Sequence, residues 1–187
     1  ALSGEGGDEL FGGYYTYVAD LLAPRVGRLA ALARPLIERL PSSSRRAASF
    51  DYKAKRFARA AALPALERHH GWKEIFDEET RGALIDANRE RGQSPLAVYR
   101  QHYAETVGAP ELARLQEIDL NVYLPSDLLV KTDRASMAHS LEARVPFLDT
   151  AVSDVALRLP TRQKVRRFDK KRLLREAFEP LLPREIT

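Results

Sequence analysis

The residues most able to do chemistry stand at the start of the chain, in the segment Ser3-Gly4-Glu5-Gly6-Gly7-Asp8-Glu9. Its glycines let the backbone turn sharply and approach a ligand closely. A glycine-rich loop that runs into a helix, here over 8–11, directs several N–H groups at one point and suits a phosphate. Because carboxylates in the same loop would repel a phosphate, the segment favours Mg²⁺ as a bridging ion. The alternative is a plain glycine turn in which Asp8 only caps a helix.

A second group of charged residues extends over 131–149. Helical spacing places Lys131 and Arg134 on one face, and Asp133 with Met137 on another. So many charges beside apolar residues are rarely all exposed, and buried charges must be paired. We therefore expect part of this group to be half-buried and Met137 to lie in the core.

The end of the same group has two interpretations, a functional site or an ion-pair lattice that fixes the loop. For Glu142, Arg144 and Asp149 we favour the lattice, because perturbed charge networks are often structural. His139 has no His or Cys partner at ligand spacing, which argues against a metal role.

The elements that must position these segments are predicted to be almost all helices. Apolar residues at helical spacing over 18–40 indicate one buried stripe, which Pro24 and Pro35 divide. The stripe consists of Leu22, Val26, Leu29, Leu32, Leu36 and Leu40.

Shorter helices are predicted between this stripe and residue 125. After a loop at 41–46, a basic helix is predicted over 50–61. Asp77 is predicted to cap a helix over 81–87, and Ser94 a helix from Pro95 to Tyr103. Pro110 is predicted to open a further helix whose apolar face consists of Leu112, Leu115, Ile118 and Val122. Leu124-Pro125 is expected to end the last of these, because the residue before a proline is biased away from the helical conformation. Ser126 then caps the next helix.

Toward the C-terminus, Asp149 is predicted to cap a helix that ends at Leu159-Pro160, and Asp169 to cap the last helix. The last helix is expected to pack four apolar residues inward, namely Leu173, Leu174, Ala177 and Phe178. Strand signals are scarce, although Ala1-Leu2 could be the tail of a strand. The predicted fold class is therefore mainly α, the helical part of a larger α/β domain.

Composition restricts the class of protein. The 187 residues are 44% hydrophobic and 30% charged, as in a folded domain with one core. The absence of cysteine excludes disulfides and Cys-ligated metal sites and fits a reducing cytoplasm. The sequence contains no run of about 18 apolar residues, so it predicts no membrane-spanning helix. The net charge of +4 comes from basic residues interleaved with acidic ones, which is typical of solvated helix faces rather than of a nucleic-acid-binding surface.

Three segments of the chain together resemble the synthetase domain of glutamine-hydrolysing asparagine synthetases. Residues 2–14 resemble the second nucleotide-site motif of that family, and 127–149, which ends in Leu-Glu-Ala-Arg-Val-Pro-Phe-Leu-Asp, resembles its other long signature. Residues 171–183 resemble its late helix. The segments occur in the family's order and bracket nearly the whole chain, whereas 16–117 carries no motif that we can match.

The resemblance implies an α/β domain of the ATP-pyrophosphatase type. There ATP and Mg²⁺ activate the side chain of aspartate as β-aspartyl-AMP and release pyrophosphate. Ammonia, which a glutaminase domain of the same polypeptide releases, then attacks to give asparagine and AMP. The resemblance leaves open whether the protein forms a homodimer.

Residue by residue, the resemblance implies that Ser3 and Gly4 contact the AMP part of ATP. Glu5 would lie beside the acyl-adenylate, support its formation and take a proton from the attacking ammonia. Asp8 would approach the pyrophosphate through Mg²⁺. β-Lactam synthetases resemble this family but carry a tyrosine at the place of Glu5, so the acid favours attack by ammonia over ring closure.

Two alternatives stay open. The first is a related amidotransferase that acts on another carboxylate, and the second is a helical binding module without chemistry. Intact Glu5 and Asp8 argue against the second. The roles of Lys131, Asp133 and Arg134 beyond ion pairing are not determined by the sequence.

The resemblance also indicates which parts of the synthetase the chain lacks. The family's Ser-Gly-Gly-x-Asp-Ser loop and its glutaminase domain would precede Ala1, and its Arg-x-Lys segment would follow Thr187. We therefore expect 1–187 to be a partial synthetase domain that is inactive alone. Such a piece should expose an apolar docking face.

Overall fold

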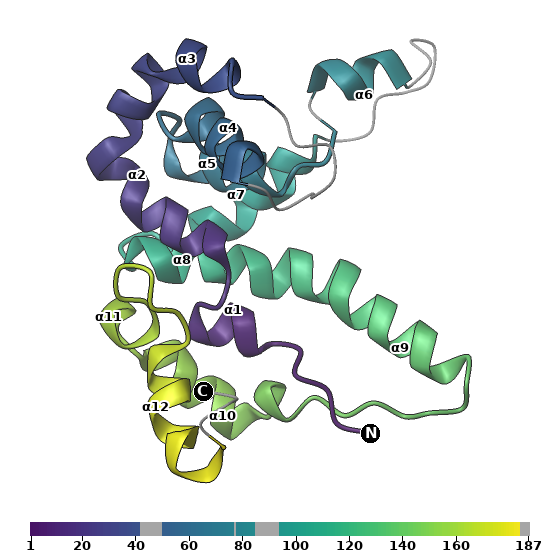
Figure 1. Cartoon of the computed structure of the whole chain (residues 1–187). Helices are drawn as coiled ribbons and strands as arrows, with labels where there is room; N and C mark the ends of the chain where they lie inside the picture. The colour runs from purple at the N-terminus through teal and green to yellow at the C-terminus, as the bar shows by residue number, and fades with distance from the viewer. Residues whose placement is uncertain (42–49, 77, 85–93, 184–187) are drawn as a thin grey trace. The chain divides into compact units, whose positions relative to one another are not determined.

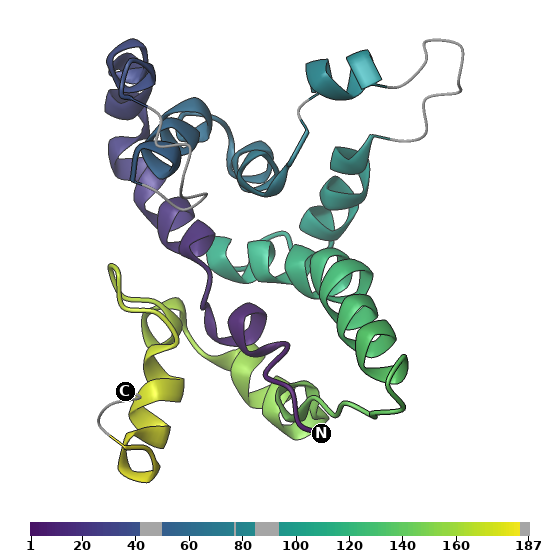
Figure 2. The same cartoon turned by 45° about the vertical axis from the view of Figure 1, so that its right-hand side comes forward.

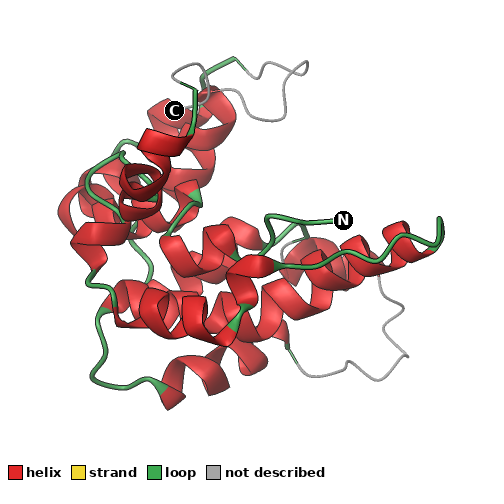
Figure 3. Ribbon diagram, turned by 90° about the horizontal axis from the view of Figure 1, so that it is seen from below, coloured by secondary structure: helices red, strands yellow, loops and turns green. Residues whose placement is uncertain are grey.

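The computed structural model describes residues 1–41, 50–76, 78–84 and 94–183. Within these ranges it consists of helices and loops without a strand (Figure 3), which confirms the prediction of a mainly α chain. The chain divides into two compact units, one formed by Ala1–Val18 with His102–Thr187 and the other by Ala19–Gln101. None of the described helices is both long enough and apolar enough to cross a bilayer.

The unit Ala19–Gln101 contains only helices and their connections among its described residues (Figure 1). They are most of α2 (Tyr15–Leu32), α3 (Arg34–Glu38), α4 (Phe50–Ala60), α5 (Ala65–Lys73), α6 (Glu78–Leu84) and most of α7 (Pro95–Glu105). The predicted starts at Phe50 and Pro95 are confirmed. The predicted residues 42–46, Asp77 and 85–87 lie outside the described ranges.

The core of this unit is built from small side chains around one tryptophan. Ala23, Ala60 and Ala61 pack with Trp72, whose ring stacks on Phe57 at 5.6 Å between centroids. A Cβ at Gly27 would collide with the carbonyl of Ala61. Small residues therefore set how closely α2 approaches the end of α4.

The predicted buried stripe over 18–40 is wrong from Leu29 onward, whereas Leu22 and Val26 are half-buried. Leu29, Leu32 and Leu36 are 68%, 79% and 70% exposed, because the face of α2 that packs carries alanine and glycine instead of leucine.

Pro35 begins α3 as predicted, but Pro24 lies inside α2 and does not divide it. A proline inside a helix leaves the carbonyl of residue i−4 without its usual N–H donor. That carbonyl belongs to Asp20, and Arg68 donates to it from Nη2 at 3.5 Å. A donor from α5 thus replaces the missing one, and α2 continues.

The unit Ala1–Val18 with His102–Thr187 carries all three sequence motifs. Its helices are α1 (Gly7–Phe11), α8 (Glu111–Ile118), η1 (Asp119–Leu129), α9 (Val130–Met137), η2 (Pro146–Leu148), α10 (Thr150–Arg158), α11 (Thr161–Lys164), α12 (Arg172–Phe178) and η3 (Glu179–Leu181), with the ends of α2 and α7. α8, η1 and α9 follow one another without a break as one continuous helical rod, which bends along its length (Figure 2).

The predicted stop at Leu124-Pro125 and the predicted cap at Ser126 are therefore wrong. Pro125 lies inside η1, which is a π-helix. The wider π turn accommodates a residue that cannot join the α-helical ladder. The predicted apolar face is confirmed at Leu112, Leu115 and Ile118, which are all buried.

The C-terminal predictions are correct in part. Asp149 caps α10 by accepting a hydrogen bond from the N–H of Ala151 at 2.9 Å, as predicted. Asp169 does not cap α12, since its carboxylate pairs with Arg175 at 2.7 Å, and α12 starts after Lys171 in the left-handed region. Leu174 packs inward with α1 and α10, whereas Phe178 is exposed.

The charged group over 131–149 is exposed, contrary to the prediction of half-buried pairs. Lys131, Asp133 and Arg134 all point to solvent, and Met137 is 53% exposed rather than in the core. Glu142 and Arg144 do pair, at 2.7 Å, on the surface. The local pattern could not reveal that α9 presents little of its surface to the core.

Candidate functional site

The first and second motifs lie side by side through their backbones (Figure 1). The N–H of Ser3 donates to the carbonyl of Arg144 at 2.7 Å, and the N–H of Arg144 donates to the carbonyl of Ala1 at 2.8 Å. Leu2 and Arg144 form a parallel bridge. The predicted strand tail at Ala1-Leu2 thus takes part in one bridge, and this pairing fixes where the glycine loop starts.

The glycines of the loop are required by what packs against them. Gly6 has φ of 83°, which an L side chain rarely adopts, and a Cβ there would collide with the side chain of Leu148. A Cβ at Gly7 would lie 3.1 Å from Phe147. The loop therefore rests directly on the Pro-Phe-Leu end of the second motif.

The third motif reaches the same loop through a lysine. Nζ of Lys171 lies 3.1 Å from Oδ1 of Asp8. Gly13 lets both side chains approach, because a Cβ there would collide with Asp8 and with Lys171. Lys171 itself has φ of 50°, a conformation that costs energy for a residue other than glycine. The contact between Lys171 and Asp8 was not predicted.

The four residues predicted to contact a ligand remain accessible. Ser3, Glu5 and Asp8 are half-buried and Gly4 is exposed, and a Cβ at Gly4 would meet nothing within 4 Å. Oε1 of Glu5 accepts a hydrogen bond from Oγ1 of Thr132 at 3.0 Å. The structure thus brings the predicted residues together on one loop and adds a partner that the sequence did not indicate.

The third acid of the loop points inward. Glu9 is 1% exposed and accepts a hydrogen bond from the hydroxyl of Tyr14 at 2.5 Å. Burial raises the pKa of Glu9, and the hydrogen bond from Tyr14 opposes part of that shift. Only two carboxylates of the loop are therefore accessible to a cation, and not the three that the sequence suggested.

A second tyrosine and acid lie near this pair. The hydroxyl of Tyr17 donates to Oδ2 of Asp119 at 2.5 Å, and both residues are completely buried. Burial, with the charge of Asp119 next in importance, raises the pKa of Tyr17 well above its ordinary value. This hydrogen bond joins the start of α2 to the start of η1.

The carbonyl end of α1 is held by a buried glutamine. Nε2 of Gln116 donates to the carbonyls of Glu9 and Leu10, and its Oε1 accepts from Nζ of Lys164 at 2.8 Å. Lys164 is 2% exposed, and burial lowers its pKa to about 8. Nothing in the local sequence indicates these contacts, because the partners are distant along the chain.

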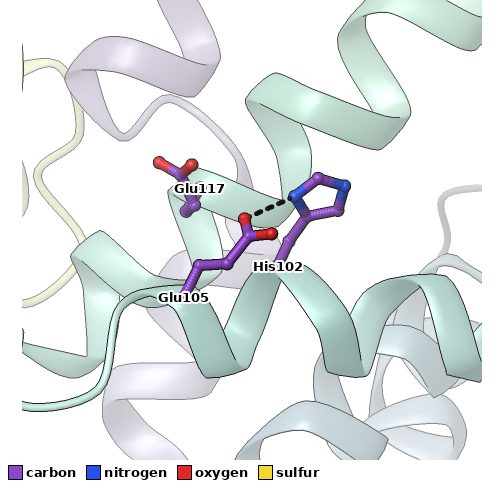
Figure 4. A group of neighbouring side chains, drawn as sticks. All are labelled: His102, Glu105 and Glu117. Atoms are coloured by element: carbon purple, nitrogen blue, oxygen red, sulfur yellow. Dashed lines mark hydrogen bonds and ion pairs between the residues drawn. The ribbon is translucent and has the colours of Figure 1, made fainter.

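Another group of potential ligands lies at the end of α7. The ligand atoms of His102, Glu105 and Glu117 lie within 4.8 Å of one another (Figure 4). Nδ1 of His102 is 3.1 Å from Glu105, and Glu117 accepts from Asn121 at 2.8 Å. Glu105 is half exposed. We interpret the group as surface ion pairing, because exposed acids gather readily without a metal, and keep Asp8 as the candidate metal ligand.

Comparisons with known proteins point to one family. The family model described as asparagine synthase matches residues 1–187. A protein of Mycobacterium tuberculosis named putative asparagine synthetase (glutamine-hydrolyzing) is 38% identical over 186 residues, which cover 99% of this chain and 28% of that protein. Asparagine synthetase (glutamine-hydrolyzing) 1 of Bacillus subtilis is 30% identical over 190 residues, which cover 100% of this chain and 29% of that protein.

A shorter match is found in the human asparagine synthetase (glutamine-hydrolyzing), which is 44% identical over 61 residues, or 31% of this chain and 11% of that protein. The chain spans less than a third of the length of the curated relatives that it matches. No solved structure matches it.

Proposed function

The chain belongs to the asparagine synthase family, and from this premise we propose that it forms one wall of an ATP site at which aspartate is amidated to asparagine through β-aspartyl-AMP. The observation that carries the proposal is the convergence of the three motif segments on one loop. Arg144 pairs with its start, Thr132 donates to Glu5, and Lys171 pairs with Asp8. Segments far apart in sequence thereby surround the accessible acids.

Glu5 is the residue that we place in catalysis. Ammonia attacks as a neutral molecule, and its adduct must then lose a proton. A half-buried carboxylate that is already oriented by a hydroxyl suits that task. Ser3 and Gly4 are proposed to contact the AMP part of ATP, and the space beside Gly4 lets a ligand approach the backbone.

Asp8 is the residue that we propose would hold Mg²⁺. Its carboxylate is 38% exposed, and Mg²⁺ takes one or two carboxylates together with phosphate oxygens. Nζ of Lys171 already contacts Oδ1 of Asp8. Lys171 must therefore share the Asp8 carboxylate with Mg²⁺ or move away from it. The residues fit a single carboxylate ligand, with the ammonium of Lys171 as additional positive charge. ATP with Mg²⁺ supplies the activating AMP group and the pyrophosphate that leaves.

The remaining proposals rest on the family alone. The ammonia is proposed to come from glutamine through a glutaminase domain of the same polypeptide, in a cytoplasmic enzyme that could form a homodimer. The helices described above are proposed to be part of an α/β domain of the ATP-pyrophosphatase type. The 187 residues by themselves are proposed to lack synthetase activity, because their sequence contains no Ser-Gly-Gly-x-Asp-Ser loop.

The test is pyrophosphate release from ATP by the complete protein that carries this sequence, with and without aspartate. We expect aspartate-dependent release from the wild type, and asparagine formation that falls by about 100-fold or more in Glu5→Ala, since a positioned base is worth 10²–10⁴-fold. The control is Glu38→Ala, which removes an exposed glutamate of the other unit and should leave both quantities unchanged. No response to aspartate, in a protein that still hydrolyses glutamine, would contradict the proposal and indicate another carboxylate substrate.

A further inference from the structure

The hydrogen bond between Thr132 and Glu5 joins α9 to the glycine loop across a sequence separation of 127 residues. We propose that Thr132 is a positioning residue that holds the Glu5 carboxylate for the attack of ammonia. This inference rests on the proposed function, because it assigns Thr132 a part in that same reaction.

The geometry of this contact is specific. A threonine in a helix usually turns its hydroxyl back to a carbonyl of its own helix, whereas Oγ1 of Thr132 reaches out of α9 to Oε1 of Glu5 at 3.0 Å. Because an ionised carboxylate can only accept, Thr132 is the donor. The terminal torsion angle of a glutamate side chain has a broad distribution. A hydrogen-bond donor on Oε1 therefore restricts the rotation of the carboxylate and leaves Oε2 to accept another proton.

The rod that carries Thr132 is anchored at the junction of α8 and η1. Asp119, the first residue of η1, is buried and accepts from Tyr17. Further along η1, burial raises the pKa of Tyr123, and the charges of Asp127 and of three more acids, Glu5 among them, act in the same direction. η1 therefore passes near the loop, and α9, which continues from η1, brings Thr132 to Glu5.

The step in which Thr132 would act is the attack on the acyl-adenylate. The ammonia nitrogen forms a bond to the carbonyl carbon, one proton passes from that nitrogen to Oε2 of Glu5, and AMP leaves with the electron pair of the broken C–O bond. Thr132 neither gains nor loses an atom. If the Glu5 carboxylate is not oriented, the attack of ammonia slows, and a larger share of the acyl-adenylate is hydrolysed by water before it reacts with ammonia.

The experiment compares Thr132→Val, which keeps the shape but removes the hydroxyl, with Thr132→Ser, which keeps the hydroxyl. Thr106→Val is the matched control, because it also removes a threonine hydroxyl, one that donates to the backbone carbonyl of Tyr103 at 3.4 Å. In the complete protein supplied with ammonium chloride, one measures kcat for asparagine, KM for ATP, and the ratio of pyrophosphate to asparagine.

For Thr132→Val we expect kcat to fall by about tenfold to 100-fold, since a misplacement of about 1 Å can cost 100-fold. KM for ATP should stay unchanged, and more pyrophosphate should be released per asparagine. Thr132→Ser should restore most of kcat, and Thr106→Val should match the wild type. An active wild type with an unaffected Thr132→Val would overturn this inference alone, as would equal losses in the Val and Ser variants. A wild type without aspartate-dependent pyrophosphate release would overturn the proposed function as well.

Discussion

The two units of this chain accommodate buried carboxylates in different ways. In the unit Ala19–Gln101, Asp20 is 1% exposed and lies between two basic groups, with Nε of Arg68 at 2.9 Å and Nδ1 of His69 at 2.7 Å. In the unit with the motifs, Asp119 and Glu9 are buried to the same degree but accept hydrogen bonds from tyrosine hydroxyls.

The difference shows that a buried acid is not by itself a sign of function. Arg68 is always charged and neutralises Asp20 in a part of the chain that carries no motif. A phenol does not neutralise a carboxylate, and the pKa of Glu9 is correspondingly raised by its burial. In the motif-bearing unit, a cation is placed on an accessible acid instead, where Lys171 contacts Asp8.

The largest effect should follow from breaking the ion pairs of Asp20. Asp20→Ala leaves the Arg68 charge buried without its carboxylate, and it should lower the free energy of unfolding by about 3–5 kcal/mol. Urea unfolding followed by circular dichroism measures the loss, and hydrogen exchange in α2 and α5 locates it. Glu38→Ala, which breaks exposed pairs with Arg34 and Arg59, should show no measurable change. Equal losses in both variants would contradict the contrast between the units.

The next effect concerns packing in the motif-bearing unit. Gly6→Ala places a side chain at φ of 83° and against Leu148, and it should cost about 2–4 kcal/mol from strain and overpacking together. Gly4→Ala is the matched control, since a Cβ there meets nothing within 4 Å, and its stability should stay within about 0.5 kcal/mol of wild type. A shift in the thermal midpoint that is as large for Gly4→Ala would contradict the observed packing of the loop.

A smaller effect is expected when a neutral donor is removed. Tyr17→Phe takes one hydrogen bond from the buried Asp119, and it should destabilise by about 1–3 kcal/mol in urea unfolding. Tyr52→Phe removes the hydroxyl of a tyrosine that is 46% exposed and should change stability by less than about 0.5 kcal/mol. If the two variants behaved alike, the phenol would not stabilise the buried carboxylate.

The smallest effect is a dependence on pH. Burial lowers the pKa of Lys164 from 10.5 to about 8, so above pH 8 the unfolded chain binds more protons at this residue than the folded chain does, and stability rises with pH. Between pH 8 and pH 9 the free energy of unfolding of the wild type, relative to Lys164→Met, should rise by about 1 kcal/mol. Titration of the tyrosines is common to both proteins and cancels in the difference. A difference that stays flat or falls would show that Lys164 is not buried as described.

Local sequence rules predicted the features that depend on neighbours in the chain. The cap at Asp149, the start of α7 at Pro95 and the buried face of α8 followed from propensity and spacing. The order of glycines and acids indicated the loop on which Ser3, Gly4, Glu5 and Asp8 are accessible. Rules of the same kind failed at the leucine stripe, because periodicity shows that a helix has an apolar face but not which face meets a partner.

The sequence by itself therefore determined the family, the helical character and the residues on which to look for chemistry, since these rest on motifs and on contacts between near neighbours. Only the tertiary structure decided that Thr132 donates a hydrogen bond to Glu5, that Lys171 contacts Asp8, and that Glu9 turns inward. It also decided that α2 passes through Pro24, where Arg68 donates to the carbonyl that the proline leaves. The physical reason is the same in each case: the partner of a polar group is set by distance in space, and these partners lie between 5 residues (Glu9 and Tyr14) and 163 residues (Asp8 and Lys171) apart along the chain.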